Sequence, residues 1–188
     1  MRRMSLLALL AIATPVLAVP TPAVPFEVPL PGTSAAAEPG LAGTVISDKV
    51  LPFTIANANV PVSGTLQVRV VRNASGKLAF YWKINNAATS KAGIESLSFG
   101  DFPKQAYDAN WRNDGLGTVA PSTAVGMYSV GDLKTWVTGF YFKAPVKPGE
   151  SSRFFFLRSG ATASVPAVAH LVGSGGGVGE VPALAPAS

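Results

Sequence analysis

Apolar residues recur at every second position between about residues 43 and 163. A period of two is typical of β-strands that bury one face, and no stretch of this region keeps the period of a helix. The clearest pair of strands is predicted at residues 65–72 and 77–85. Residues 73–76 (Asn-Ala-Ser-Gly) lie between them and include residue types that tolerate positive φ, so a β-hairpin is predicted here.

Aromatic residues are concentrated in two further predicted strands, at residues 135–143 and 152–159. The Pro-Gly turn at residues 146–150 predicts a second hairpin, because proline presets φ and glycine accepts a left-handed conformation. About seven to nine short strands favour a single antiparallel β-sandwich, immunoglobulin-like or jelly-roll-like, with disordered N- and C-terminal tails. The remaining strands are predicted at residues 44–50, 94–99 and 124–130.

The first 18 residues have the three parts of an export signal. Arg2 and Arg3 supply the positive start, residues 6–13 form a short apolar core, and residues 16–18 suit a signal peptidase. Cleavage is predicted after Ala18. We expect no stable membrane span after cleavage, since the apolar run is shorter than the ~20 residues that cross a bilayer. Because the chain has no cysteine for lipid attachment, it is expected to be secreted, whether periplasmic or extracellular.

Composition divides the rest of the chain into three parts. Residues 19–42 hold six prolines and are expected to be a solvated linker. Residues 43–163 are the predicted sandwich domain. Residues 164–188 are rich in glycine, proline and alanine and are expected to be a flexible tail. About 170 residues remain after cleavage, which suffices for one hydrophobic core.

Charge and residue content exclude several kinds of function. The formal net charge of +5 falls to +3 without Arg2 and Arg3, and no basic run remains, so nucleic acid is not an expected partner. The single histidine, His170, falls in the predicted tail. We therefore expect neither a Ser-His-Asp triad nor a metal site built from histidines. The ten carboxylates show no local pattern of a glycosidase pair. We therefore expect no enzymatic activity and no cofactor beyond the cation considered next.

A dense polar cluster occupies residues 101–115. Its carboxylate and amide oxygens are the ligands that calcium prefers, so a weak structural Ca²⁺ site is one hypothesis. The spacing does not match an EF-hand loop, which would place a ligand and a glycine where Arg112 and Asn113 stand. In the other interpretation, these side chains cap turns within a long loop. The candidate metal ligands are Asp101, Asp108, Asn110 and Asp114.

Trp111 differs from the other two tryptophans in its surroundings. Trp82 and Trp136 fall in phase with apolar neighbours and are predicted in the core. Trp111 lies in a polar segment and is predicted either to bind a sugar ring as an exposed platform or to cover an open end of the sandwich. Tyr81 and Tyr141 are predicted on the opposite faces of their strands, where they form a second candidate surface. The candidate ligand-binding residues are Trp111, Tyr107, Arg112 and Asn113.

Turn and strand motifs occur at residues 64–72 (GTLQVRVVR), 78–86 (LAFYWKINN), 114–121 (DGLGTVAP) and 148–152 (PGESS). Through them, residues 43–163 resemble exported bacterial β-sandwich proteins of unknown function, of the PEP-CTERM type. The sorting tail is degenerate or absent here, because the sequence VPALAP near the C-terminus lacks the glutamate of the Val-Pro-Glu-Pro signature. The resemblance implies a setting of extracellular polysaccharide and biofilm matrix.

Two functions remain open from the sequence. The first is a non-catalytic exported structural or extracellular-matrix-associated protein of bacterial type, with extracellular polysaccharide or matrix proteins as partners. The second is a carbohydrate-binding module that uses the Trp111 loop. Exposure of Trp111 is expected to separate the two, since an aromatic groove favours the second and a buried Trp111 favours the first.

Overall fold

The structure is a computed structural model that describes residues 17–56, 60–100, 102–129 and 135–188. These residues form twelve β-strands and one short 3-10 helix, η1 (Pro39–Leu41). The strands are β1 (Val19–Thr21), β2 (Phe26–Pro29), β3 (Thr44–Ile55), β4 (Val62–Arg72), β5 (Leu78–Asn86), β6 (Ile94–Phe99), β7 (Tyr107–Trp111), β8 (Thr123–Tyr128), β9 (Trp136–Val146), β10 (Phe155–Arg158), β11 (Ser164–Gly173) and β12 (Val178–Pro186).

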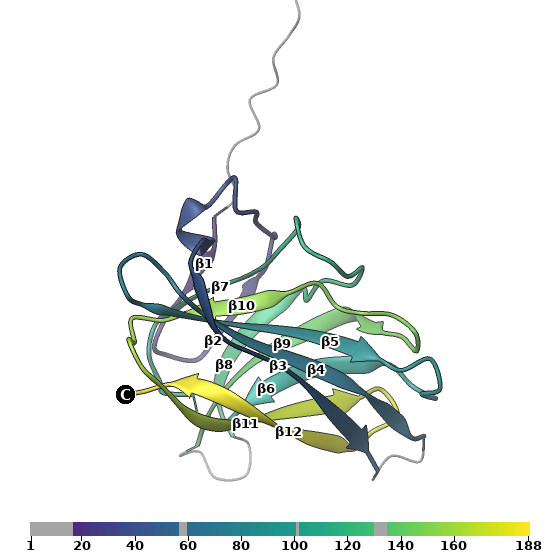
Figure 1. The fold of residues 1–188 in the computed structure, drawn as a ribbon. Helices are drawn as coiled ribbons and strands as arrows, with labels where there is room; N and C mark the ends of the chain where they lie inside the picture. The colour runs from purple at the N-terminus through teal and green to yellow at the C-terminus, as the bar shows by residue number, and fades with distance from the viewer. Residues whose placement is uncertain (1–16, 57–59, 101, 130–134) are drawn as a thin grey trace, which may run out of the picture.

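The strands are arranged in two antiparallel sheets of six strands each (Figure 1). Sheet A has the order β1-β7-β10-β5-β4-β3, and sheet B has the order β12-β11-β6-β9-β8-β2. β12 of sheet B packs beside β3 of sheet A, so two edge strands lie together at one side of the molecule. The all-β sandwich predicted from the sequence is confirmed.

Aromatic rings from both sheets form the centre of the core. Trp82 on β5 has no exposed surface, and its ring centroid lies 4.6 Å from that of Phe99, 5.9 Å from that of Phe140 and 6.0 Å from that of Phe155. Such pairs contribute about 0.5–1.5 kcal/mol each beyond the burial of their area. Trp136 is also buried, so the prediction that both tryptophans belong to the core is confirmed.

The hairpin predicted between the first two strands is confirmed as β4–β5. The side-chain oxygen of Asn73 accepts hydrogen bonds from the backbone N–H groups of Ser75 and Lys77. Gly76 has a φ of 79°, which an L side chain rarely adopts. Asparagine and glycine thus have the turn roles that the sequence predicted for them.

The prediction of a second hairpin was wrong. The Pro-Gly turn forms as expected, with Gly149 at a φ of 81° and the Glu150 N–H bonded to the Lys147 carbonyl at 3.0 Å. However, β9 pairs with β6 and β8 in sheet B, whereas β10 pairs with β5 and β7 in sheet A. Turn residues specify that the chain reverses, but they do not specify which sheet the next strand joins.

The predicted linker and tails are corrected by the structure. Within residues 19–42, β1 pairs with β7 and β2 pairs with β8. Within residues 164–188, β11 and β12 are paired strands of sheet B, and the glycine-rich stretch between them is their connecting turn. His170 therefore lies on a strand, 3.7 Å from Glu180, and not on a flexible tail. The VPALAP sequence belongs to β12 and buries Val181 and Ala185 completely.

Prolines explain why composition was misleading here. Each of the four edge strands carries a proline: Pro20 on β1, Pro29 on β2, Pro52 on β3 and Pro182 on β12. One side of an edge strand makes no hydrogen bonds to a neighbouring strand, so proline, which has no backbone N–H group, is tolerated there. Proline on an edge strand also discourages pairing with strands of other chains. The composition that favours a solvated linker is therefore equally suited to the rim of a sandwich.

Removing residues 178–188 tests this correction. We expect the truncated protein to lose about 5 kcal/mol or more of unfolding free energy, because a buried valine alone contributes about 1.5–3 kcal/mol and β11 would become exposed. The melting temperature should fall by roughly 10 °C or more. Circular dichroism melting measures it, with deletion of residues 187–188 as the control. Equal melting of the two truncated proteins would restore the flexible-tail interpretation.

Candidate functional site

Sheet A is apolar on both of its faces. On β5, Phe80 and Trp82 point into the main core, while Tyr81 between them belongs to a second cluster on the outer face. The prediction that Tyr81 lies opposite Trp82 is confirmed, but the second surface predicted from Tyr81 and Tyr141 was wrong, because Tyr81 is buried on sheet A and Tyr141 is exposed on sheet B. Around β10, Phe155 is likewise in the main core and Phe156 is in the outer cluster. The buried residues of the outer cluster are Ala18, Leu41, Val71, Ala79, Tyr81 and Phe156.

Residues 33–43, which we call the covering segment, lie over this outer face. The Thr33 N–H bonds to the Trp111 carbonyl at 2.9 Å, and the Ala35 N–H bonds to the Asp114 carboxylate at 2.8 Å. At the far end of the segment, Leu41 of η1 is 5% exposed and packs into the outer cluster. The segment predicted to be part of a linker therefore closes a second, smaller core.

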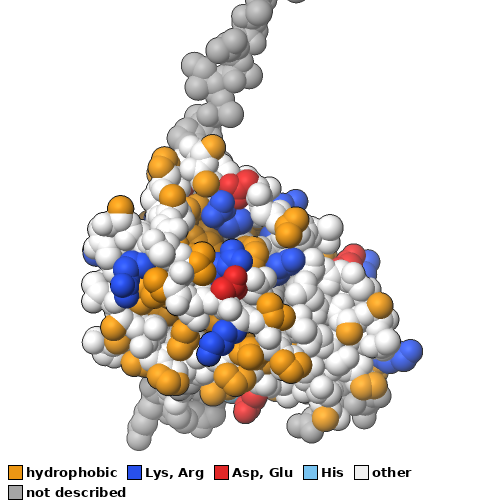
Figure 2. Space-filling view, in the orientation of Figure 1, with side chains coloured by type: hydrophobic (Ala, Val, Ile, Leu, Met, Phe, Trp, Pro, Cys, Tyr) orange, Lys and Arg blue, Asp and Glu red, His pale blue; other side chains and the backbone are white. Residues whose placement is uncertain are grey.

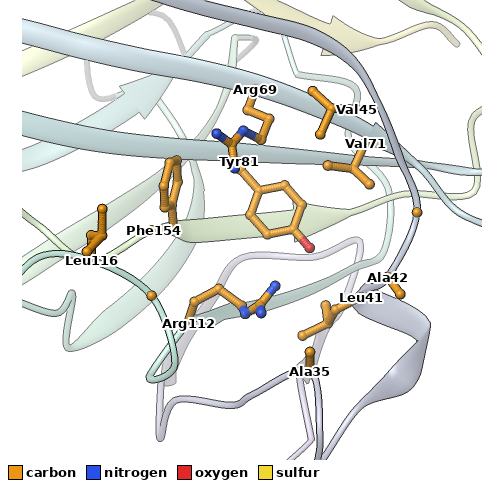
Figure 3. Close-up of a pocket in the computed structure, with 12 residues that line it drawn as sticks. Ala35, Leu41, Ala42, Val45, Arg69, Val71, Tyr81, Arg112, Leu116 and Phe154 are labelled. Carbon is orange, nitrogen blue, oxygen red and sulfur yellow. The ribbon is translucent and has the colours of Figure 1, made fainter.

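A pocket of about 520 Å³ opens where the covering segment meets sheet A (Figure 3). We call it the outer-face pocket. Its volume falls in the range of about 300–1,000 Å³ that is typical of small-molecule sites. On the face that carries β3 and β4, Lys and Arg side chains lie among hydrophobic ones (Figure 2). Its apolar walls include Leu41, Val71, Leu116 and Phe154. Its polar side chains are Arg69, Tyr81 and Arg112.

Tyr81 lies at the centre of the outer-face pocket, and its hydroxyl points to the same space as the Arg112 guanidinium (Figure 3). The residue is 4% exposed, and its hydroxyl has no hydrogen-bond partner of normal geometry among the described residues. Burial raises the pKa of Tyr81, although the positive charge of Arg112, its N–H contact with the hydroxyl oxygen and the charge of Arg158 oppose that rise. The phenol is therefore neutral near pH 7 and keeps its proton as a donor.

Each of the two pocket arginines is paired with a carboxylate. The Arg112 Nε and Nη2 atoms bind Asp114 at 2.6 and 2.8 Å, and Arg69 binds Asp48 through the same two atoms at 3.1 and 2.7 Å. The Arg69 guanidinium also lies 4.8 Å from the ring centroid of Phe154. These contacts orient both guanidinium groups without using Nη1. The bond to Asp114 is the main cause that raises the pKa of Arg112.

A glycine places the loop that closes the outer-face pocket on one side. Gly117 has a φ of 102°, and a side chain at this position would meet the Ser152 carbonyl oxygen at 2.0 Å. The close approach lets residues 112–116 lie against the chain that leads into β10. As a result, Leu116 is held at the rim of the pocket with 76% of its surface exposed.

The structure does not bring the four predicted sugar-binding residues together. Trp111 is half-buried, donates from its indole nitrogen to the Leu30 carbonyl at 3.0 Å, and has the Arg153 guanidinium 5.5 Å from its ring centroid. Tyr107 is buried in the main core and donates to the Pro103 carbonyl at 2.7 Å. Burial raises the pKa of its hydroxyl. Asn113 is exposed beyond the end of β7, and of the four, Arg112 lines the outer-face pocket.

The predicted metal ligands have separate partners. Asp101 lies outside the described residues. Asp108 binds Arg158 at 3.0 Å, and Asp114 is held by Arg112. The Asn110 oxygen accepts a hydrogen bond from the Gly32 N–H at 2.8 Å. Over the part of the chain that the structure describes, no group of three His, Cys, Asp or Glu side chains is placed to hold a metal ion.

Sequence reasoning missed Arg69, Leu41 and the covering segment. One signal was available, because residues 154–157 (Phe-Phe-Phe-Leu) are apolar at every position. A strand without alternation is buried on both faces. The run therefore predicts that something covers the outer face of sheet A, although it does not identify the segment that does so.

No known protein family, no curated protein and no solved structure matches this chain. Within the described ranges, no helix has the length and apolar character needed to cross a bilayer. The chemistry of the pocket residues is therefore the basis for proposing a function.

The Arg112–Asp114 pair predicts a specific loss of stability in acid. The bond from Arg112 is the main cause that lowers the pKa of Asp114 to about 2, from an ordinary value of 3.8. Because the folded-state pKa is the lower one, the stabilisation is fully present above about pH 4 and is lost as the pH falls towards 2. In Asp114→Asn we expect a smaller loss of unfolding free energy between pH 4 and pH 2 than in the parent.

Urea unfolding at pH 7, 4 and 2.5 measures this difference. At pH 7 the variant should be less stable by up to about 1 kcal/mol, since the ion pair is partly exposed. Glu27→Gln, which removes an exposed carboxylate, serves as the control. An acid dependence of Asp114→Asn identical to that of the parent would contradict the prediction.

Proposed function

We propose that this chain is a non-catalytic exported protein of bacterial type that associates with extracellular matrix, and that it binds through the outer-face pocket. The observation that carries the proposal is the buried Tyr81 hydroxyl, which lies beside the Arg112 guanidinium and whose own proton has no acceptor among the described residues. Leaving such a group unsatisfied costs about 1–3 kcal/mol, and unsatisfied groups in folded proteins call for an explanation. A ligand that supplies the missing hydrogen bond offsets this cost.

The polar groups of the outer-face pocket suit binding better than proton transfer. Its titratable side chains are Arg69, Tyr81 and Arg112. Arginine remains charged at all ordinary pH values, and the raised pKa of Tyr81 keeps the phenol protonated. General acid–base catalysis works best with a group whose pKa lies near the working pH. The pocket therefore favours the non-catalytic role.

One observation favours the carbohydrate-binding alternative in a modified form. The loop that follows Trp111 contributes Arg112, Gly115 and Leu116 to the outer-face pocket. The loop is thus part of the proposed site through Arg112 and not through the indole ring. A matrix polysaccharide that binds here would do so through an anionic or apolar group, because the pocket has few polar partners for sugar hydroxyls.

Export is tested by expressing the full chain in a bacterium and analysing the culture medium and the periplasm. We expect mass spectrometry to find a chain that begins at Val19, because the export signal predicts cleavage after Ala18. Leu9→Arg places a charge in the apolar core of the signal and should leave the 188-residue chain inside the cell. An unprocessed parent chain in the cytoplasm would contradict the proposal.

Matrix association is tested by retention of the exported protein on insoluble extracellular matrix of the producing cell. We expect Arg112→Gln to reduce retention at least about tenfold, which corresponds to 1.4 kcal/mol. Arg72→Gln is the matched control, because Arg72 is an exposed arginine of β4 that does not line the outer-face pocket. Equal retention of both variants, each checked for an unchanged fold, would contradict the pocket as the binding site.

Trp111→Phe separates the two candidate functions. Phenylalanine keeps much of the packing of Trp111 but removes the indole ring. If retention falls for Trp111→Phe and not for Arg112→Gln, the protein binds through the Trp111 platform. The outer-face pocket predicts the reverse order.

A further inference from the structure

The outer-face pocket is lined by two guanidinium groups, which offer N–H donors. Arg69 and Arg112 line it, whereas their carboxylate partners Asp48 and Asp114 are not among the described residues that do. Since each carboxylate occupies Nε and Nη2, the Nη1 atoms lie outside the ion pairs. The planar fork of arginine is suited to carboxylate and phosphate groups.

The rest of the pocket lining is hydrophobic. Leu41 and Val71 are buried at its inner end, while Leu116 is 76% exposed and Val45 is 49% exposed at the rim. Binding becomes more favourable when a ligand removes exposed apolar surface from water. Such walls favour a ligand with an apolar body and disfavour one covered with hydroxyl groups.

Tyr81 supplies a neutral hydrogen-bond donor beside these charged and apolar groups. Its neutral hydroxyl can donate one hydrogen bond, and no described residue accepts it. The hydroxyl oxygen has almost no exposed surface, so a ligand must displace a neighbouring side chain to reach it. The Arg112 guanidinium lies beside it, so a ligand group that reaches the Tyr81 hydroxyl also meets the Arg112 N–H donors.

We infer that the outer-face pocket binds an organic monocarboxylate with an apolar body, whose carboxylate is held by the Tyr81 hydroxyl and the Arg112 guanidinium. The apolar body lies along Leu41, Val71 and Phe154. This inference rests on the proposed function, which places binding in the same pocket. The ligand is either a free small acid or the terminal carboxylate of a protein chain with an apolar last side chain, since the two present the same chemistry.

A single negative charge fits the pocket better than a double one. Asp114 already neutralises much of the charge of Arg112, and Asp48 does the same for Arg69. The two arginine–aspartate pairs carry no net charge together, so one ligand carboxylate binds through charge-assisted hydrogen bonds, and a phosphate dianion would bring a second uncompensated negative charge. A neutral amide of the same shape would lose the charge-assisted hydrogen bonds, which are about twice as strong as neutral ones.

Isothermal titration of the protein purified after expression of the full chain tests the inference. The probes are 4-methylpentanoate as a free acid, N-acetyl-leucine as a terminal carboxylate, 4-methylpentanamide as the neutral analogue, glucuronate and inorganic phosphate. We expect at least one of the two apolar acids to bind at least about tenfold more tightly than the other three probes. The tighter of the two acids identifies the source of the carboxylate.

Tyr81→Phe is the decisive variant, because it removes the hydroxyl and leaves the ring. We expect the affinity for the apolar acid to fall about tenfold while the melting temperature changes little, since the hydroxyl makes no hydrogen bond of normal geometry in the unliganded protein. Tyr141→Phe is the matched control, as Tyr141 is 45% exposed on sheet B. Unchanged affinity in Tyr81→Phe, or equal binding of acid and amide, overturns the inference.

Preferential binding of glucuronate or phosphate would also overturn it. The proposed function can be judged separately from these results. If no apolar acid binds but matrix retention still depends on Arg112, the carboxylate inference fails and the proposed function stands. If retention is also independent of Arg112, both fail.

Discussion

The outer-face pocket depends on one buried carboxylate. Glu38 of the covering segment has a side chain that is 8% exposed, and it pairs with Arg158 of β10. In the 188-residue chain its second oxygen also accepts a hydrogen bond from the Ala18 N–H at 3.0 Å, a contact that cleavage after Ala18 removes. Removing one partner of such a pair leaves an uncompensated buried charge, which typically costs 3–5 kcal/mol. The pair therefore ties the covering segment to β10 of sheet A.

As a result, sheet A has buried apolar residues on both of its faces. Its inner face meets sheet B around Trp82, and its outer face meets the covering segment around Tyr81. The second interface is small, so the covering segment does not reach across the whole sheet. Where it ends, apolar side chains and two arginines remain in contact with solvent, and a pocket results. The pocket is thus a consequence of incomplete cover over an apolar sheet face.

Local patterns predicted the fold well where they determine the structure by themselves. Alternation located β4, β5 and β6, and the Asn73–Gly76 turn was assigned correctly from its residue types. The ends of the domain were not predictable in this way, since proline and glycine occur both in linkers and in edge strands or turns. Sheet membership of β10 was not predictable either, because it depends on the long-range pairing with β5 and β7.

The candidate site was predicted less well, because its residues were grouped by closeness along the chain. On β7, Tyr107 and Trp111 face the main core, whereas Asp108 and Asn110 face the other side. Applied to this strand, the period of two would have separated the aromatic residues from the polar ones. Arg112, the next residue in phase with Asp108 and Asn110, is the one that reaches the outer-face pocket.

The run of apolar residues at 154–157 is buried on both faces of sheet A. Its side chains alternate between the main core and the outer cluster, so its sequence demands cover on both faces of sheet A. Leu41 of the covering segment packs against this outer face. The only carboxylate of the segment, Glu38, attaches it to sheet A through Arg158. An apolar strand without alternation therefore indicates both that a second cover exists and that a binding pocket can form along its edge.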